Sequence, residues 1–241
     1  DPGYGKLNPF IRLLMPLLVP HQRQLDLEAA KQVDVFIANS TETQKRIKKY
    51  YGHSSTVIHP PVETNRFTPA RKRGNHYVTI GRQLPYKRYD LAVKAATKLN
   101  KKLIVFGNGP AHDQLVKLAG PTVEFRTDRF GDASDAEYEK AITTARGFIY
   151  PAEEDFGIVS VEALAAGAPV IGLARGGTTD IVTSPDIGTL FHHQTVDDVV
   201  KAVEIAEQTS FHPSKLARTA KRFDKGLFLT KIKKVVRDSI S

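Results

Sequence analysis

The sequence has 241 residues, enough for one large domain or for one complete domain with a substantial part of a second. Its composition, 41% hydrophobic and 25% charged, excludes collagen-like and wholly disordered proteins, and the absence of cysteine excludes disulfides, thiolate metal sites and cysteine nucleophiles. The formal net charge is +9, with the basic excess within residues 1–150, which suits a phosphate-bearing ligand, a nucleic acid or an anionic membrane surface without choosing among them.

The first 60 residues contain pieces of an α/β structure without a complete core. Pro16 should break an apolar helix, and Asn39, Ser40 or Thr41 should cap a basic one. The predicted elements are, in chain order, helices at residues 8–20 and 21–31, a strand at 34–38, a helix at 43–51 and a strand at 56–59. Two strands are too few for an independent sheet, so we expect residues 1–60 to be the last part of a domain whose beginning is absent.

The most apolar run, residues 10–20, is about half as long as the ~20 residues that a membrane span needs. The chain start also lacks the basic region of a signal peptide. Two interpretations of this run stay open: a helix that lies on a membrane surface, and a core helix of its own domain. In the second case we expect self-association or a partner chain at residues 8–20.

A regular alternation of strands and helices follows the linker at residues 61–75, which begins where Pro60 and Pro61 end a strand. The predicted strands are residues 77–80, 103–106, 122–125, 147–150, 169–172 and 188–191. The predicted helices between and after them are residues 88–99, 111–119, 135–145, 157–167 and 195–208. This pattern predicts a Rossmann-like, doubly wound parallel sheet over residues 76–212, followed by C-terminal helices within 213–241.

In such sheets ligands bind beyond the carboxyl ends of the strands, so the loops there hold the candidate site residues. Gly81, Arg82 and Lys87 follow the first strand. The two cations, Arg82 and Lys87, either bind a ligand or are solvated surface charges. Gly107, Asn108 and Gly109 follow the second strand and permit close backbone approach to a ligand, but they do not form a dinucleotide fingerprint, so a turn is the favoured interpretation. No other phosphate-binding, zinc-protease or serine-hydrolase motif occurs.

The loop after the fourth strand carries three adjacent carboxylates at residues 153–155. These are costly beside an apolar strand unless they are solvated or engaged with hydroxyls or cations. A helix that starts after Gly157 would direct its free N–H groups toward the same crevice, and it carries Glu162. The sequence therefore predicts either an anion- and hydroxyl-binding crevice or a solvated acidic loop.

The pair Glu154 and Glu162, within EDFGIVSVEALAAGAPVI, resembles the E-x7-E segment of the family 4 retaining glycosyltransferases of the GT-B fold. The segments GRQLPYKRYDLAV, VFGNGP and ARGGTTDIV extend the resemblance, as do FIANSTETQKRIKKYYG and VIHPPVETNRF nearer the N-terminus. The resemblance implies that residues 76–212 are the donor-binding domain and that residues 1–60 end an acceptor-side domain. It is strongest to the mannosyltransferase-like bacterial branch. One departure is Asp180, where the family often has Glu.

The resemblance also implies roles for individual residues. Arg82 and Lys87 would bind the donor diphosphate, Glu154 the transferred sugar and Glu162 the ribose hydroxyls, so that Arg82, Lys87 and Glu154 would be catalytic. Backbone groups at Phe156, Gly157, Ile158 and Val159 would face the phosphate or sugar. The nucleobase would lie near Arg126–Arg129 and beside Gly107, Asn108 and Gly109, and Gly81 would also belong to the donor-binding residues.

The implied function is transfer of a hexose, first of all mannose from GDP-mannose, to a glycan or lipid-linked acceptor, as in polysaccharide biosynthesis. UDP-glucose and UDP-N-acetylglucosamine are the next donors. No cofactor or metal ion is expected, and the chain lacks a D-x-D metal motif. The expected location is the cytoplasm, at its membrane face if residues 10–20 touch lipid. The alternative is a non-catalytic module that binds a nucleotide or polyanion.

Two further clusters favour no function of their own. The adjacent His192 and His193 would point to opposite faces of a strand, which is unsuited to a shared metal ion. The basic and aromatic residues 45–51 could contact nucleic acid, but they are more typical of a solvated helix face, so nucleic acid is not an expected partner.

Overall fold

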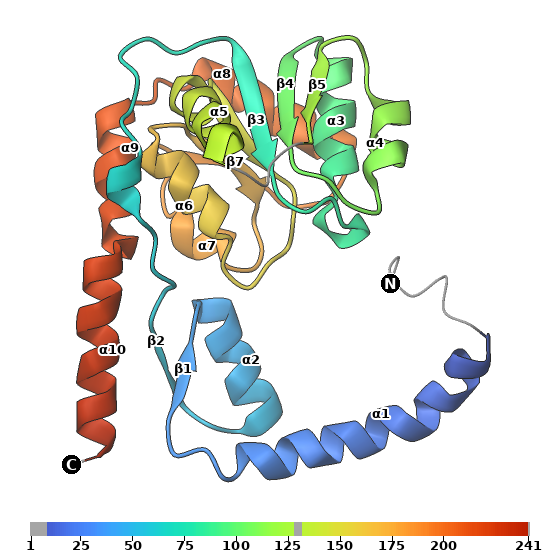
Figure 1. The fold of residues 1–241 in the computed structure, drawn as a ribbon, viewed down its shortest axis with the longest axis vertical. Coiled ribbons are helices and arrows are strands. Elements are labelled where there is room, and N and C mark those ends of the chain that lie inside the picture. The colour runs from blue at the N-terminus through green and yellow to red at the C-terminus, as the bar shows by residue number, and fades with distance from the viewer. Residues whose placement is uncertain (1–8, 128–131, 241) are drawn as a thin grey trace.

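The computed structural model describes residues 9–127 and 132–240, and a six-stranded parallel sheet is at its centre (Figure 1). The strands are β3 (His76–Ile80), β4 (Lys102–Phe106), β5 (Val123–Arg126), β6 (Gly147–Tyr150), β7 (Val170–Leu173) and β8 (Gly188–Phe191). Their order across the sheet is β5-β4-β3-β6-β7-β8, so the direction of winding reverses between β3 and β6. This confirms the predicted doubly wound, Rossmann-like fold.

Both faces of the sheet are covered because each strand sends alternate apolar side chains to opposite sides. On one face Phe148 and Tyr150 pack in a cluster with residues of α5, α6 and α9. On the other face Ile149 packs in a cluster with residues of α3, α4 and α8. The helices are α3 (Tyr89–Lys98), α4 (His112–Leu118), α5 (Asp132–Thr144), α6 (Ile158–Ala165), α7 (Thr178–Ile181), α8 (Val196–Gln208), α9 (Pro213–Ala220) and α10 (Lys225–Ser239).

A separate small structure precedes the sheet, and we call residues 9–60 the N-terminal unit and residues 76–223 the sheet domain. The N-terminal unit comprises α1 (Pro9–Ala30), β1 (Phe36–Ala38), α2 (Thr41–Tyr51) and β2 (Ser55–Val57), with β1 and β2 paired in parallel. Ser40 is the N-cap of α2, since its side chain accepts a hydrogen bond from the N–H of Thr43. The domain boundaries proposed from the sequence stay a prediction.

One expectation about the N-terminal unit is wrong, because α1 is a single helix that contains both Pro16 and Pro20. Each proline removes one helical hydrogen bond and frees the carbonyl four residues earlier. Both prolines are exposed, so water can solvate the freed carbonyls. Leu18 is also exposed, as expected for this run, although the side chains of residues 10–14 lie outside the described residues. Among the described residues, no helix combines the length and the apolarity of a membrane span, and this includes the 22-residue α1.

Asp180 joins the N-terminal unit to the sheet domain. Its carboxylate accepts the backbone N–H of Thr41 at 2.7 Å, accepts the Thr41 hydroxyl, and lies 3.1 Å from Nε2 of His59. The His59 ring stacks on Phe156 and meets Phe223 edge-on, with ring centroids 5.4 and 5.1 Å apart. Thr41 is the first residue of α2, so the carboxylate also lies at the positive end of that helix.

We expect Asp180→Asn to lower the free energy of unfolding by about 1–3 kcal/mol at neutral pH, the usual cost of losing one partner of a buried hydrogen-bonded group. Burial raises the pKa of Asp180, but the hydrogen bonds from Thr41 and His59 lower it by more, so the pKa lies below its usual value of 3.8. The stabilisation is therefore present above this value and is lost as the pH falls through the lowered pKa.

Urea unfolding at neutral pH and in steps below the usual carboxyl pKa of 3.8 measures this difference. The exposed Asp238, which pairs with Lys234 on α10, supplies the control Asp238→Asn, and its effect should stay within about 0.5 kcal/mol. An equal loss of stability in both variants would contradict the role given to Asp180.

Candidate functional site

A cavity of about 590 Å³ opens where the winding of the sheet reverses. The loop after β3 forms one wall, and the loop after β6 together with the start of α6 forms another. Such a reversal separates the loops at the carboxyl ends of two adjacent strands and leaves a crevice between them. The lining residues are Asn39, Pro60, Ile80, Gly81, Arg82, Tyr86, Lys87, Glu153, Glu154, Asp155, Phe156, Gly157, Ile158 and Val159.

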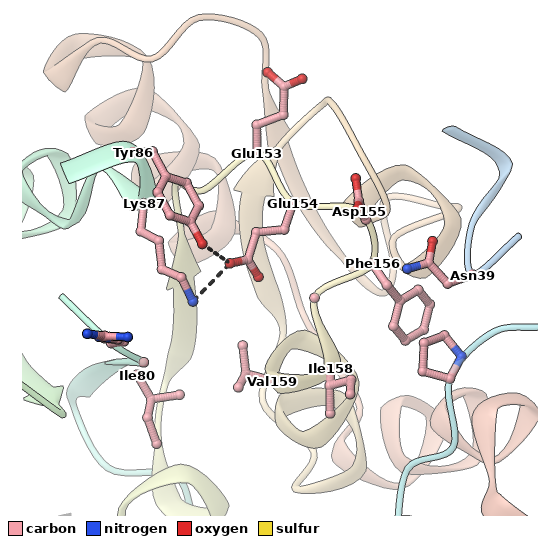
Figure 2. Close-up of a pocket in the computed structure, with 14 residues that line it drawn as sticks. Asn39, Ile80, Tyr86, Lys87, Glu153, Glu154, Asp155, Phe156, Ile158 and Val159 are labelled. Atoms are coloured by element: carbon pink, nitrogen blue, oxygen red, sulfur yellow. Dashed lines mark hydrogen bonds and ion pairs between the residues drawn. The ribbon is translucent and has the colours of Figure 1, made fainter. Parts of the chain in front are cut away.

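Glu154 is at the centre of the polar groups in this cavity (Figure 2). One carboxylate oxygen lies 2.8 Å from Nζ of Lys87 and 3.4 Å from the Tyr86 hydroxyl, and the other accepts the Tyr150 hydroxyl. Burial, with a contribution from the Glu154 carboxylate, raises the pKa of Tyr150, so its phenol stays a hydrogen-bond donor at neutral pH. The loops after β3 and β6 are therefore joined by an ion pair inside the cavity.

The loop that follows β7 holds the backbone of Glu154. The N–H of Gly177 donates to the carbonyl of Glu154 at 2.9 Å. Gly176 has φ of +62°, and a Cβ there would overlap the same carbonyl oxygen. Only glycine permits this conformation and this close approach without strain.

The N-terminus of α6 is a second polar feature of the cavity. Gly157 precedes the helix with φ of +91°, and no side chain caps the first turn. Ile158 and Val159 line the cavity, so the first N–H groups of the helix lie at its wall. Uncapped N–H groups at a helix N-terminus favour an anion.

Arg82 lines the cavity with its side chain exposed, and within the described residues its guanidinium forms neither a hydrogen bond nor an ion pair. Gly81, just before it, is buried with φ of +144°, and a Cβ there would overlap the Tyr89 hydroxyl. That hydroxyl donates to the carbonyl of Ile80 at 2.7 Å and fixes the end of β3. The loop is thus anchored at its start, and Arg82 remains available to a ligand.

The loop after β4 supports the loop after β3 and does not line the cavity. Gly107 has φ of +101°, and a Cβ there would overlap the carbonyl oxygen of Gly81. The fully buried Gln83 donates to the carbonyl of Gly107 at 2.7 Å, and its own N–H donates to the carbonyl of Asn108 at 2.8 Å. Gly109 approaches the backbone of Gln83 just as closely. The two loops therefore pack together through Gln83, a residue that the sequence analysis did not single out.

Two further predicted donor-binding residues lie outside the cavity lining, as Gly107, Asn108 and Gly109 do. Glu162 is half-buried on α6, where its carboxylate accepts the Tyr138 hydroxyl at 3.0 Å. Arg126 pairs with Glu124 at 2.5 Å and lies 3.8 Å from Glu137. Residues 128–131, the rest of the predicted nucleobase loop, lie outside the described residues. The ribose and nucleobase contacts stay predictions.

Several residues that line the cavity or contact Glu154 were missed by the sequence analysis. Tyr86 lies between the two predicted cations, and Tyr150 is the last residue of a predicted strand, positions from which a hydroxyl can reach a ligand crevice. Asn39 and Pro60 bring the N-terminal unit to the cavity wall. The side-chain oxygen of Asn39, which the sequence suggested only as a helix cap, is buried with no hydrogen-bond partner among the described residues.

The remaining sequence clusters are surface features. His193 is exposed and lies 2.9 Å from the Asp198 carboxylate. Across residues 9–127 and 132–240, no group of three or more His, Cys, Asp or Glu side chains is arranged to hold a metal ion. In the basic helix, Lys45 and Lys49 are exposed, whereas Arg46 turns toward the acidic loop after β6.

Comparison with known protein families finds a match over residues 61–223, to the family described as Glycosyl transferases group 1. The chain is 31% identical over 167 residues to the D-inositol 3-phosphate glycosyltransferase of Mycobacterium leprae (strain Br4923), an alignment that covers 61% of this chain and 39% of that protein. It is 26% identical over 199 residues to the protein of the same name from Mycobacterium bovis (strain BCG / Pasteur 1173P2), with 73% and 42% covered. The chain thus spans about two fifths of the length of these relatives.

Solved structures with the same fold include Anabaena Alr3699/HepE in complex with UDP and glucose, with a TM-score of 0.75, 18% identity and coverage of 90% of this chain and 67% of that one. Sucrose-phosphate synthase from Thermosynechococcus elongatus has a TM-score of 0.74 and 19% identity, with 91% and 61% covered. The pneumococcal O-GlcNAc transferase GtfA in complex with UDP and GlcNAc has a TM-score of 0.68 and 18% identity, with 90% and 47% covered. At these identities the similarity concerns the fold.

Proposed function

The chain belongs to the glycosyl transferases group 1 family, and on this premise we propose that its cavity binds the diphosphate and the sugar of a nucleotide sugar. One observation carries the proposal: the cavity places cationic and hydroxyl-binding groups side by side. Arg82, Lys87 and the N-terminus of α6 suit a diphosphate, while Glu154 suits the hydroxyls of a sugar.

The proposed reaction is the transfer of a hexose with retention of configuration. Cleavage of the sugar–phosphate bond leaves negative charge on the departing phosphate oxygen. Arg82, Lys87 and the N-terminus of α6 would stabilise this charge without a metal ion, because they are already oriented at the cavity wall. Glu154 would accept hydrogen bonds from the hydroxyls of the transferred sugar. This would place the bond to be broken beside the cations.

The first donor proposed is GDP-mannose, with UDP-glucose and UDP-N-acetylglucosamine next. Two similar folds were solved with UDP and a sugar, which is the reason to test uridine and guanosine donors together. The proposed acceptor is a glycan or a lipid-linked molecule, and the proposed location is the cytoplasm, at its membrane face if α1 contacts lipid. The chain covers only part of its relatives, so transfer by the whole protein is part of this proposal.

Isothermal titration calorimetry on the 241-residue chain tests the proposal with GDP, UDP and the three nucleotide sugars above. We call the ratio of the Kd of a nucleoside diphosphate to the Kd of its sugar conjugate the sugar benefit. The proposal expects a sugar benefit above one for at least one donor, and affinities unchanged by a chelator. A chain that merely binds a nucleotide or polyanion would give no sugar benefit and a steep salt dependence, and this outcome would favour the alternative function.

Glu162→Ala tests the proposed ribose contact. The ribose belongs to both the nucleoside diphosphate and its sugar conjugate, so we expect both affinities to fall alike, by about tenfold, as for a lost hydrogen bond to a charged group. Tyr138→Phe removes the hydrogen bond from Tyr138 to Glu162 and controls for simple loss of packing, since it keeps the carboxylate. Unchanged affinity in Glu162→Ala would remove Glu162 from the site.

A further inference from the structure

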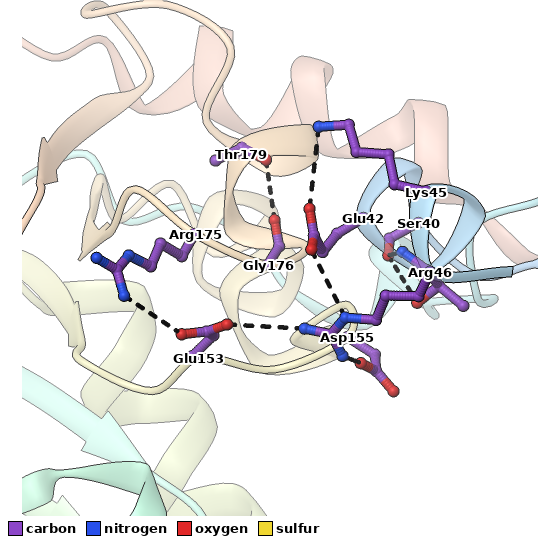
Figure 3. Close-up of polar contacts among 10 residues, drawn as sticks. Ser40, Glu42, Lys45, Arg46, Glu153, Asp155, Arg175, Gly176 and Thr179 are labelled. Atoms are coloured by element: carbon purple, nitrogen blue, oxygen red, sulfur yellow. Dashed lines mark hydrogen bonds and ion pairs between the residues drawn. The ribbon is translucent and has the colours of Figure 1, made fainter. Parts of the chain in front are cut away.

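Helix α2 of the N-terminal unit reaches the acidic loop of the sheet domain through one side chain, Arg46 (Figure 3). Its guanidinium lies 2.7 Å from the Asp155 carboxylate and 3.6 Å from the Glu153 carboxylate. Arg175, in the loop after β7, lies 3.9 Å from Glu153, and Glu42 on α2 lies 3.6 Å from Arg46. These charges form a network at the outer side of the loop.

The two carboxylates that Arg46 contacts are the chain neighbours of Glu154. Figure 2 shows Glu154 turned toward Lys87 and Tyr86, with Glu153 turned away from them. The backbone of Glu154 is held by the Gly177 N–H, and Glu153 and Asp155 are held on the outer side by Arg46. The loop is therefore held on both sides of Glu154, whose carboxylate contacts Lys87 in the cavity.

The network also opposes the mutual repulsion of three adjacent carboxylates. Glu153, Glu154 and Asp155 carry like charges on consecutive residues, and each has a cationic partner. Arg46 pairs with Glu153 and Asp155, Arg175 pairs with Glu153, and Lys87 pairs with Glu154. A single exposed ion pair contributes little, but a network around one guanidinium with a 2.7 Å contact has the geometry in which the contribution is measurable. Loss of Arg46 would let Asp155 and Glu153 rearrange, and Glu154 with them.

We propose that Arg46 is a positioning residue: from the N-terminal unit it holds the loop 153–155 so that Glu154 faces the donor sugar. This inference rests on the function proposed above, since it assigns Arg46 an effect on the sugar and not on the diphosphate. It makes the sugar side of the cavity depend on the contact between the N-terminal unit and the sheet domain.

The test measures the sugar benefit in Arg46→Ala by calorimetry, with the nucleotide sugar that the unaltered chain binds best. We expect the sugar benefit to fall about fivefold, the effect of losing a small ion-pair network, while the Kd of the nucleoside diphosphate changes less than about twofold. Arg46→Lys should restore only part of it, because an ammonium cannot contact two carboxylates through a planar fork. Lys49→Ala is the matched control, since Lys49 is another exposed cation on α2 and its ammonium lies over the Tyr50 ring.

Asp155→Asn separates positioning from simple neutralisation of charge. If Arg46 positions the loop, Asp155→Asn also lowers the sugar benefit, and the double variant is no worse than either single one. If Arg46 only neutralises the loop, Asp155→Asn tightens nucleoside diphosphate binding and leaves the sugar benefit intact, which overturns the proposal. Melting temperatures of all variants show whether each is folded.

The remaining outcomes are equally decisive. Equal weakening of the binding of the nucleoside diphosphate and its sugar conjugate in Arg46→Ala would make Arg46 a structural residue only. No change in the binding of either ligand would show that Arg46 has no role in the site. Either outcome overturns the proposal while the proposed function stands. Absence of any sugar benefit in the unaltered chain would instead overturn the proposed function, and this inference with it.

Discussion

Lys87→Ala is expected to weaken the binding of a nucleoside diphosphate by about 10- to 100-fold, the range that follows from losing a charge-assisted hydrogen bond. The side chain lies mostly buried at the cavity wall, where its ammonium pairs with Glu154 at 2.8 Å. Removing it deletes the cation and also leaves the Glu154 carboxylate facing the diphosphate without its partner. Both effects disfavour the anion, so the loss should exceed that of an ordinary surface lysine.

Calorimetry with GDP and UDP measures this loss, and Lys94→Ala is the control. Lys94 is a half-exposed lysine on α3, where its ammonium lies 3.9 Å from Asp90. The control should change the affinity less than about twofold, as expected for an exposed and screened charge. A loss of affinity of less than about twofold in Lys87→Ala would show that Lys87 serves only to hold Glu154.

Glu154→Gln is expected to have effects of opposite sign on the two ligands. The Glu154 carboxylate pairs with Lys87 and so competes with a diphosphate for this cation, and its neutralisation should tighten nucleoside diphosphate binding by about three- to tenfold. The same change removes the charged acceptor for the sugar hydroxyls, so the sugar benefit should largely disappear.

Titrations of both ligands against Glu154→Gln and against Glu63→Gln test this prediction. Glu63 is exposed and pairs with Lys225, so it makes the same change of charge at another surface. Should Glu154→Gln weaken both ligands, the carboxylate would have to serve the folding of the loop, for example through its contact with Tyr150, and not the sugar.

The arrangement of the sheet could be predicted because each strand is a short, continuous apolar run bounded by loops. Runs such as residues 147–150 can be buried only in a sheet covered on both faces, and the helices between them then impose parallel pairing. The loops at the strand ends followed from this topology, so Arg82, Lys87 and Glu154 could be placed together before the structure was known. The cavity lining contains all three.

What could not be predicted depends on contacts between segments far apart in the sequence. Arg46 and Asp155 are 109 residues apart, and Thr41 and Asp180 are 139 apart, so no local pattern signals either pair. The helix break predicted at Pro16 was wrong for a different reason. The effect of a proline within a helix depends on whether water can reach the carbonyl that the proline leaves without its helical hydrogen bond. The placement of Glu162 against Tyr138 likewise depends on how α5 and α6 pack.

The cavity has walls from two separately built parts of the chain, and this has a thermodynamic consequence. Asn39 and Pro60 complete the lining only while the N-terminal unit stays docked, and the docking depends on Asp180, Thr41 and His59. Any measured affinity is therefore the intrinsic affinity multiplied by the fraction of molecules in the docked arrangement. A substitution at the docking contacts reduces that fraction without touching the ligand, and it should lower the affinity for guanine and uracil nucleotides by one common factor. A change in base preference would have to arise at the residues that contact the base.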